Sequence, residues 1–520
     1  MALEQTFCPS GYHIAMNRSD TTPTSTFARQ IMAAALSLTF LLPAMPLRAQ
    51  PVGLPSMGTA SSADLPPMLE RQLGEAIMAQ GRRDPTYIND PELRQYLTTM
   101  ARKLSAFAPG GLPDIEVFGV RDPEINAFAM PGGFIGVNTG LIVSSGSESE
   151  LASVLGHEIG HVAQRHIARG MTQQSQSGMM MMATLAGALL AALAGGGGDL
   201  AMGVAAFGQA AAINRQLGFS REAEREADRT GLQMLSRAGY DPDGMAKMFG
   251  RLMNASRLNE GMGGGAWAST HPLSIDRMSD VQNRIRDLPA SRYVDSDDFW
   301  YVRAKMRVVQ GRDVTSLRTA QQQLTDESRA LSGIRQSAAF YGLALYSLQR
   351  GDLPGAESAF AQATSGNLNT PELAKLGIDI AIARKDAARA LSLAQAATKR
   401  WPDRRALGMA YASALQLNGQ NAEAQAYLRG RIKEWGADEP TFYQLLAQSE
   451  ERTGNLIASR RDMARFYVAT GAYAAAESQL QQARGMSRDF YEQSQIDVQI
   501  KEVQQKLADE RALLQRFKSG

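Results

Sequence analysis

The chain has 520 residues, a net charge of +2, 44% hydrophobic residues and 20% charged residues. Its length is about three times that of a typical domain, so we expect two or more domains. The near-neutral charge gives no electrostatic reason to expect nucleic-acid binding, and we find no nucleic-acid motif. A single cysteine excludes a disulfide framework.

Residues 1–49 are expected to form a signal peptide. Arg18 and Arg29 precede the apolar segment Ile31–Leu42, which is too short to cross a bilayer comfortably. A retained N-terminal anchor is the alternative. Because the only cysteine, Cys8, lies within residues 1–49, the mature protein would contain none, which suits an oxidising compartment. We therefore expect the bacterial periplasm.

The first folded domain is expected over residues 68–290, after a disordered lead at 50–67 that is rich in Pro, Ser, Gly and Ala. Helical apolar spacing covers residues 68–107. Short β-rich segments follow at Ile115–Val120, Ala127–Met130 and Phe134–Val137. The turn Pro131–Gly133 separates the last two, which predicts a hairpin.

The most informative motif is H-E-x-x-H, formed by His157, Glu158 and His161. Residues four apart share one face of a helix, so the two imidazoles can bind one cation. Glu158 is one step round the helix, where it can take a proton from a water that the metal activates. The motif predicts a zinc peptidase. The alternative is a helix whose histidines fall four apart by chance.

The helix that carries this motif has a clear beginning. Ser147 and Glu150 form a capping box, and we expect the helix to run to about Ala168 and to stop at Gly170. In such a helix His166 lies off the ligand face, so we expect it to be structural or exposed.

An apolar insertion rich in methionine and glycine follows, over residues 179–213. Its first apolar stretch ends near Ala194 and is shorter than the roughly 20 residues that span a bilayer. We favour a mobile flap beside the cleft that contacts substrate, a partner or a membrane surface, because methionine adapts to many surfaces. A packed helical hairpin and a membrane-spanning hairpin are the alternatives.

A second helix is predicted to begin near Ser220. Glu224 and Asp228 are four apart and share a face. A neighbouring row of small residues would let another helix approach closely: Ala223, Ala227 and Gly231. Taken alone, the acidic residues fit a solvated helix, but a zinc peptidase needs a third protein ligand.

These features resemble the H-E-x-x-H gluzincin family that includes HtpX, the CAAX prenyl endopeptidases and the mitochondrial Oma-type proteases. The resemblance rests on Asn126–Phe128 followed by Pro131–Gly133, on Glu150–His161, and on the E-x-x-x-D helix. It implies that Glu224 is the third ligand of one zinc ion and that Asp228 holds an imidazole N–H.

The resemblance also implies a role for His271, which lies in a His-Pro segment after the ligand helix. In the soluble periplasmic subgroup a comparable histidine can occupy the open position of zinc and keep the enzyme latent. We expect His271 to act as such a plug or as a transition-state donor. A capped loop histidine is the alternative. Arg277 is a weaker candidate for binding substrate carbonyls.

Residues 291–520 are alanine-rich and helical in pattern. Four alanines recur with a spacing of 34 residues, each after a helix break: Ala356, Ala390, Ala424 and Ala458. This period is typical of tetratricopeptide repeats. A last helix would cap the stack with Ile496, Ile500, Val503 and Leu507. The expected fold is therefore mainly α: a small α+β gluzincin-type metallopeptidase domain followed by an α-solenoid.

The two halves together resemble the BepA-like periplasmic protease–chaperones of Gram-negative bacteria. This resemblance implies a zinc endopeptidase with chaperone activity that acts on misfolded or stalled outer-membrane proteins, together with the β-barrel assembly machinery. The alternative is a non-proteolytic chaperone or assembly adaptor with a mostly latent zinc site. The insertion at 179–213 adds a possible peripheral membrane contact.

Overall fold

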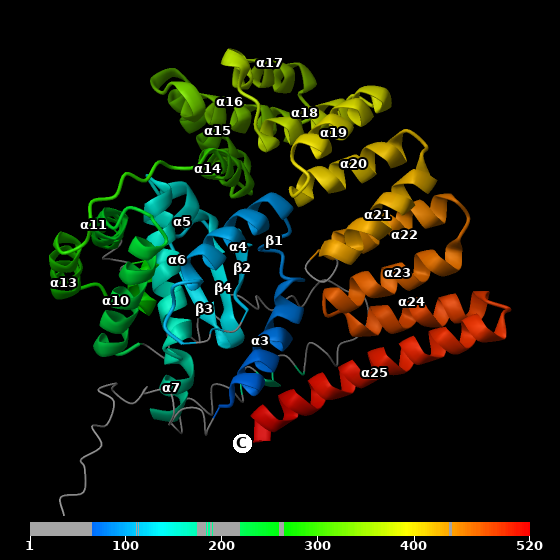
Figure 1. Cartoon of the computed structure of the whole chain (residues 1–520), viewed down its shortest axis with the longest axis horizontal. Coiled ribbons are helices and arrows are strands. Elements are labelled where there is room, and N and C mark those ends of the chain that lie inside the picture. Colours follow the sequence, from blue (N-terminus) through cyan, green and yellow to red (C-terminus); the bar gives the residue numbers. More distant parts are fainter. Residues whose placement is uncertain are drawn as a thin grey trace, which may run out of the picture. The chain divides into compact units, whose positions relative to one another are not determined.

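The computed structural model describes residues 65–110, 112, 114–173, 184, 186–187, 190, 219–258, 265–435 and 439–519. This part of the chain is mainly α-helical with one small sheet, which confirms the predicted fold class (Figure 1). The first described helix is α3 (Pro67–Gly81), close to the predicted domain start. The expected signal peptide and most of the expected lead lie outside the described residues.

The sheet has four strands in the order β1-β2-β4-β3. β3 (Ala127–Met130) and β4 (Phe134–Asn138) pair antiparallel, so the predicted hairpin is confirmed. β2 (Glu116–Val120) runs parallel to β4. β1 (Tyr87–Ile88) was not predicted, because its two residues are defined by pairing with β2 rather than by a local pattern.

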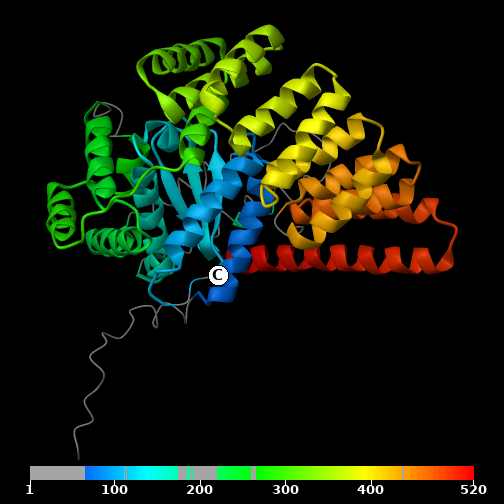
Figure 2. The same ribbon diagram turned by 45° about the horizontal axis from the view of Figure 1, so that its top comes forward.

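Successive side chains of the strands point to opposite faces of the sheet, and both faces are buried. Val117 and Ile135 share a cluster with residues of α4 (Pro91–Ser105) and α6 (Glu148–Ala163). Phe118 and Phe128 point to the opposite face, where they share a cluster with α3 and with Leu514 of α25 (Phe490–Ser519). Figures 1 and 2 show α4 lying across the strands.

α10 (Arg221–Arg237) packs closely against α6. A Cβ on Gly231 would lie 2.9 Å from the backbone nitrogen of His157, and one on Gly160 would lie 2.9 Å from the carbonyl oxygen of Ala227. The predicted row of small residues therefore does permit close approach of two helices. This crossing brings the acidic face of α10 against the histidine face of α6.

α6 ends earlier than predicted. The Ser147 hydroxyl caps its first turn, but the helix stops at Ala163 and Arg165 adopts a positive φ of 52°. A separate helix, α7 (His166–Gln173), then begins. A long-range contact accompanies the break, because the Arg165 guanidinium lies 3.1 Å from the carboxylate of Glu70 on α3. The expected continuous helix to Ala168 is thus wrong.

The other α-helices of the first half are α5 (Thr139–Ser144), α11 (Asp243–Leu258), α12 (Gly265–Thr270) and α13 (Ile275–Arg286). Of these, α11 packs on α6 and α13 packs on α10.

Among the described residues from 297 onward, the only secondary-structure elements are helices. They are α14 (Asp297–Val309), α15 (Val314–Ala330), α16 (Gly333–Gln349), α17 (Leu353–Ala363), the short 3₁₀ helix η4 (Ser365–Asn367), α18 (Pro371–Ala383), α19 (Ala387–Arg400), α20 (Arg405–Leu417), α21 (Asn421–Trp435), α22 (Thr441–Arg452), α23 (Leu456–Ala469), α24 (Tyr473–Met486) and α25.

The 34-residue spacing corresponds to pairs of these helices. Ala356, Ala390 and Ala424 are fully buried near the start of α17, α19 and α21. Residues with positive φ, including Gly351 and Gly419, separate the first helix of a pair from the second. The helical hairpin is therefore the repeating unit.

The insertion at 179–213 lies outside the described residues except at four positions. Two of these, Ala186 and Leu190, pack with the cluster that contains Phe118 and Leu514. Within the described part of the chain, no helix is both long and apolar enough to cross a membrane.

Candidate metal centre

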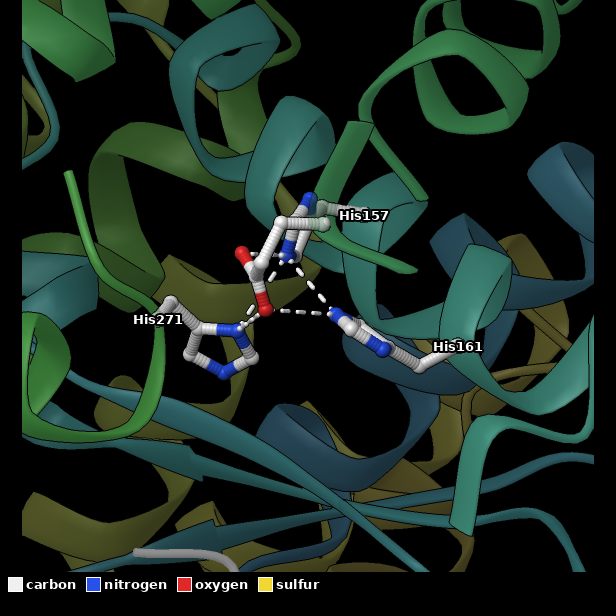
Figure 3. A group of neighbouring side chains, drawn as sticks. His157, His161 and His271 are labelled. Atoms are coloured by element: carbon white, nitrogen blue, oxygen red, sulfur yellow. Dashed lines mark hydrogen bonds and ion pairs between the residues drawn. The ribbon is translucent and has the colours of Figure 1, made fainter. Parts of the chain in front are cut away.

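Four side chains from three parts of the chain converge on one point. His157 and His161 come from α6 and His271 follows α12 (Figure 3), and Glu224 comes from α10. One potential ligand atom from each lies within 4.8 Å of all the others. Each of these residues is at most 3% exposed. The four residues form a group that could hold a metal ion.

The distances identify the atoms that face this point. Nε2 of His161 lies 3.0 Å from Nε2 of His157 and 3.4 Å from Oε1 of Glu224. Nδ1 of His271 lies 2.9 Å from the same Glu224 oxygen and 3.3 Å from Nε2 of His157. Two imidazoles and a carboxylate from α6 and α10 therefore offer three ligands, and His271 offers a fourth.

Asp228 lies behind His157. Its Oδ1 accepts a hydrogen bond of 2.9 Å from Nδ1 of His157. Burial opposes ionisation of Asp228, but hydrogen bonds from Arg277 and His157 outweigh it and keep the Asp228 pKa below its usual value. Because an ionised carboxylate only accepts hydrogen bonds, Nδ1 of His157 carries the hydrogen. Its Nε2 then presents a lone pair to the convergence point.

Arg277 does not face a cleft. Its side chain is 3% exposed, and it contacts Asp228, Glu224 and the carbonyl oxygen of Pro272. The suggestion that it binds substrate carbonyls is therefore replaced by a role inside the site. It holds the two acidic residues of α10 and the loop that follows His271.

Glu158 borders the group without belonging to it. Its Oε2 accepts a hydrogen bond of 2.8 Å from the backbone N–H of Ala129 on the edge strand β3. Its Oε1 lies 3.4 Å from Nε2 of His271 and has no hydrogen-bond partner among the described residues. Burial raises the pKa of Glu158, so its carboxylate has a greater affinity for a proton than a solvated one.

Two aromatic side chains cover the centre. Trp267 stacks on His271 with 4.4 Å between ring centroids, and Phe219 stacks on His161 at 4.0 Å. The sequence reasoning missed both residues. The signal available was weak: each aromatic lies within a few positions of a metal-site segment, but neither belongs to the motif.

His166 is also closer to the centre than the sequence indicated. The helix break at Arg165 turns its ring back, so that Nδ1 of His166 lies 2.8 Å from Nδ1 of His161. Burial lowers the pKa of His166 to about 4, so the ring is neutral at neutral pH. The expectation of a structural or exposed residue missed this contact, because no local signal predicted the break.

The electrostatics of the group fit a cation. Burial lowers the pKa of His161 well below its usual value, which keeps this ligand neutral. Burial alone would raise the pKa of Glu224, but the charge of His271 helps to hold it well below the usual value. Burial also disfavours charge on His271, yet Glu224 and Glu158 outweigh this effect and raise its pKa. Positive charge is thus favoured where these carboxylates converge.

Comparisons with known proteins agree with this geometry. The model of Peptidase family M48 matches residues 88–285. The putative beta-barrel assembly-enhancing protease of Vibrio cholerae is 36% identical over 282 residues, covering 52% of this chain and 56% of the relative. The chain therefore spans little more than half the length of that relative.

Two further relatives match over most of their lengths. The beta-barrel assembly-enhancing protease of Yersinia pestis is 30% identical over 416 residues, covering 80% of this chain and 82% of the relative. Its counterpart in Escherichia coli K12 is 29% identical over 472 residues, covering 89% of this chain and 92% of the relative. Both matches extend well beyond the region matched by the family model.

Proposed function

Because this chain belongs to peptidase family M48 and is a metalloendopeptidase, we propose that it is a zinc-dependent endopeptidase of the bacterial periplasm that degrades stalled outer-membrane β-barrel proteins and assists their assembly. The convergence of His157, His161 and Glu224 beside Glu158 is the observation that carries the catalytic part. The names of the relatives supply the client class. The expected signal peptide supports the compartment.

In this proposal His157, His161 and Glu224 are the protein ligands, because two imidazoles and one carboxylate suit zinc. Zinc held there would polarise the peptide carbonyl and make a nearby water acidic. Asp228 keeps the hydrogen of His157 on Nδ1 and so presents the Nε2 lone pair inward.

Glu158 is proposed as the general base. The Ala129 N–H fixes one carboxylate oxygen, and the other oxygen is left directed toward His271. That oxygen can accept the proton of the attacking water and deliver it to the leaving amine. The raised pKa of Glu158 favours the first of these steps, because a carboxylate with a higher pKa is a stronger base toward the attacking water.

The helical region is proposed to be a tetratricopeptide array that binds clients or assembly components. The 34-residue period and the burial of Ala356, Ala390 and Ala424 support this assignment. Solenoids of this kind offer long surfaces for peptide recognition. The proposed domain boundary falls between residues 290 and 291.

A non-proteolytic adaptor is the competing function, and the burial of the whole metal group favours it in the resting state. Glu158→Gln distinguishes the two functions. We expect the purified variant to retain zinc and to lose proteolysis of unfolded β-barrel proteins. In cells that lack the wild-type protein, failure of this variant to restore outer-membrane integrity supports the protease. Full rescue would assign the essential work to the adaptor.

Metal analysis tests the ligand set separately. We expect close to one zinc per chain in the wild type and a large loss in Glu224→Ala. A matched substitution on the same helix, Glu222→Ala, removes an exposed carboxylate and should leave the zinc content unchanged. Unchanged zinc in Glu224→Ala would remove that residue from the set.

A further inference from the structure

A chain of three side chains leads from the candidate ligand His161 to the surface. Nδ1 of His161 lies 2.8 Å from Nδ1 of His166, and Nε2 of His166 lies 3.0 Å from Oε2 of Glu226. The same Glu226 oxygen lies 2.7 Å from the guanidinium of Arg169 on α7. His166 is 2% exposed, whereas the Glu226 side chain is 37% exposed.

The direction of these hydrogen bonds follows from the donors available. The ionised carboxylate of Glu226 can only accept, so Nε2 of His166 must carry a hydrogen. A neutral imidazole has one hydrogen, which leaves Nδ1 of His166 as an acceptor. The hydrogen between the two rings must therefore belong to Nδ1 of His161. Its Nε2 is then left with a lone pair.

That lone pair has the orientation that a metal ligand requires. Nε2 of His161 is the atom that faces Nε2 of His157 and Oε1 of Glu224. If the hydrogen of His161 moved to Nε2, a donor would point into the group and the ligand would be lost. The ring of His161 is also held by Phe219, which stacks on its face.

We infer that His166 is a positioning residue for metal binding: with Glu226 and Arg169 it holds His161 in the tautomer that offers Nε2 to the metal. His157 is oriented by one direct carboxylate, Asp228, whereas His161 is oriented through an intervening imidazole. The inference rests on the proposed ligand role of His161. It adds His166, and the ion pair of Glu226 with Arg169, to the residues on which metal affinity depends.

The geometry depends on the break at Arg165. In a continuous helix, residues five apart point in directions about 140° apart, and the two rings could not meet. The positive φ of Arg165 breaks the helix just before His166, and an ion pair between Arg165 and Glu70 accompanies the break. α3, α6, α7 and α10 thus all contribute to placing one ligand.

Two substitutions of His166 in the full chain test the inference, with zinc alone as the probe. His166→Phe keeps a flat ring but removes both hydrogen bonds. His166→Gln keeps an acceptor toward His161 and a donor toward Glu226. Competition with a chelator should show zinc affinity about 10–100-fold weaker in His166→Phe, as for other residues that orient metal ligands. His166→Gln should recover most of that loss.

Histidine-selective ¹⁵N NMR provides a readout that simple packing would not change. The zinc-loaded wild type should show a hydrogen on Nδ1 of His161, protected from exchange. Wild-type zinc affinity in His166→Phe, or a His161 Nδ1 that carries no hydrogen, would overturn the inference.

Glu226→Gln covers the case in which His166→Phe fails to fold, because it changes a partly exposed residue. It should weaken zinc binding measurably, while Glu222→Gln on the exposed part of the same helix should not. Equal zinc affinities in Glu226→Gln and Glu222→Gln would contradict the inference that Glu226 helps His166 to orient His161. His161→Ala separates this failure from failure of the proposed site: if it also retains zinc, the ligand set itself is wrong.

Discussion

Arg277 donates two hydrogen bonds to the carboxylate of Asp228, from Nε to Oδ2 over 2.7 Å and from Nη2 to Oδ1 over 2.8 Å. The same guanidinium lies 2.6 Å from Oε2 of Glu224. One buried cation therefore fixes two carboxylates on α10, one that orients His157 and one that faces the metal group. A planar guanidinium can do this because its N–H donors point in several fixed directions, whereas a lysine ammonium is a single point charge.

Replacement of Arg277 should damage metal binding and folding by different amounts. Arg277→Lys keeps the charge but not the bidentate geometry, so zinc affinity should fall by roughly tenfold. Arg277→Met leaves two buried carboxylates without their partner and should lower the free energy of unfolding by about 3–5 kcal/mol. Chelator competition and urea denaturation measure the two effects. Arg284→Met, which breaks an exposed ion pair, is the control and should change neither quantity much.

Removal of His271 should increase proteolysis. Its imidazole lies 2.9 Å from Glu224 and 3.4 Å from Glu158, which is where the proposed mechanism places the substrate carbonyl and the attacking water. His271→Ala should retain zinc and cleave unfolded β-barrel clients faster. Cleavage should disappear in the double variant with Glu158→Gln, which attributes it to this site. Slower turnover of every substrate would instead indicate that His271 stabilises the transition state.

Client capture should depend on an apolar groove in the helical region. The groove has a volume of about 750 Å³ between α17, α18 and α19, and it is lined by Phe360, Ile380, Leu393 and Trp401 among other residues. Leu393→Glu places a charge in it and should weaken binding of an unfolded β-barrel client by about tenfold or more. Leu417→Glu changes a leucine of similar exposure outside the groove lining. Equal loss in both variants would exclude the groove as the recognition surface.

Point substitutions test this better than truncation after Ala290. α14 buries Phe299 and Tyr301 in the same cluster as residues of α4 and α6. Removing everything beyond residue 290 would therefore expose the core of the peptidase region as well as delete the groove.

Docking of the last helix should weaken as pH rises. Burial raises the pKa of Glu510 on α25 to about 7, against an ordinary value of 4.5, although Arg83 opposes the shift. A carboxyl whose pKa is raised by folding stays protonated in the folded state after it ionises in the unfolded state. Stability is therefore fully present below pH 4.5 and is lost progressively up to about pH 7.

Glu510→Gln should remove this pH dependence. At pH 8 the variant should be more stable than the wild type by at most about 3.5 kcal/mol, since the pKa rises from 4.5 to about 7 and each pKa unit corresponds to about 1.4 kcal/mol. At pH 4.5 the two proteins should unfold alike. Thermal unfolding and hydrogen exchange of α25 measure the difference. The control is Glu502→Gln, an exposed position on the same helix; an equal stabilisation there would refute the assignment to Glu510.

Local patterns were sufficient for much of the site. The i,i+4 spacing of His157 and His161, and of Glu224 and Asp228, places each pair on one helical face whatever the helix later packs against. The small residues of α10 predicted the close helix crossing because steric contact depends on side-chain size at that spacing. The hairpin of β3 and β4 followed from its turn residues. The metal roles themselves remain predictions.

Only the tertiary structure decided the features that depend on contacts between distant residues. β1 exists because it pairs with β2, and Arg277 turns inward because two carboxylates of α10 need a buried cation. The same is true of His166: the sequence around Arg165 shows no helix stop, and the break accompanies an ion pair with Glu70, 95 residues earlier in the chain. A local pattern determines which residues share a helix face, but where a helix ends can be set by a partner that the local sequence does not contain.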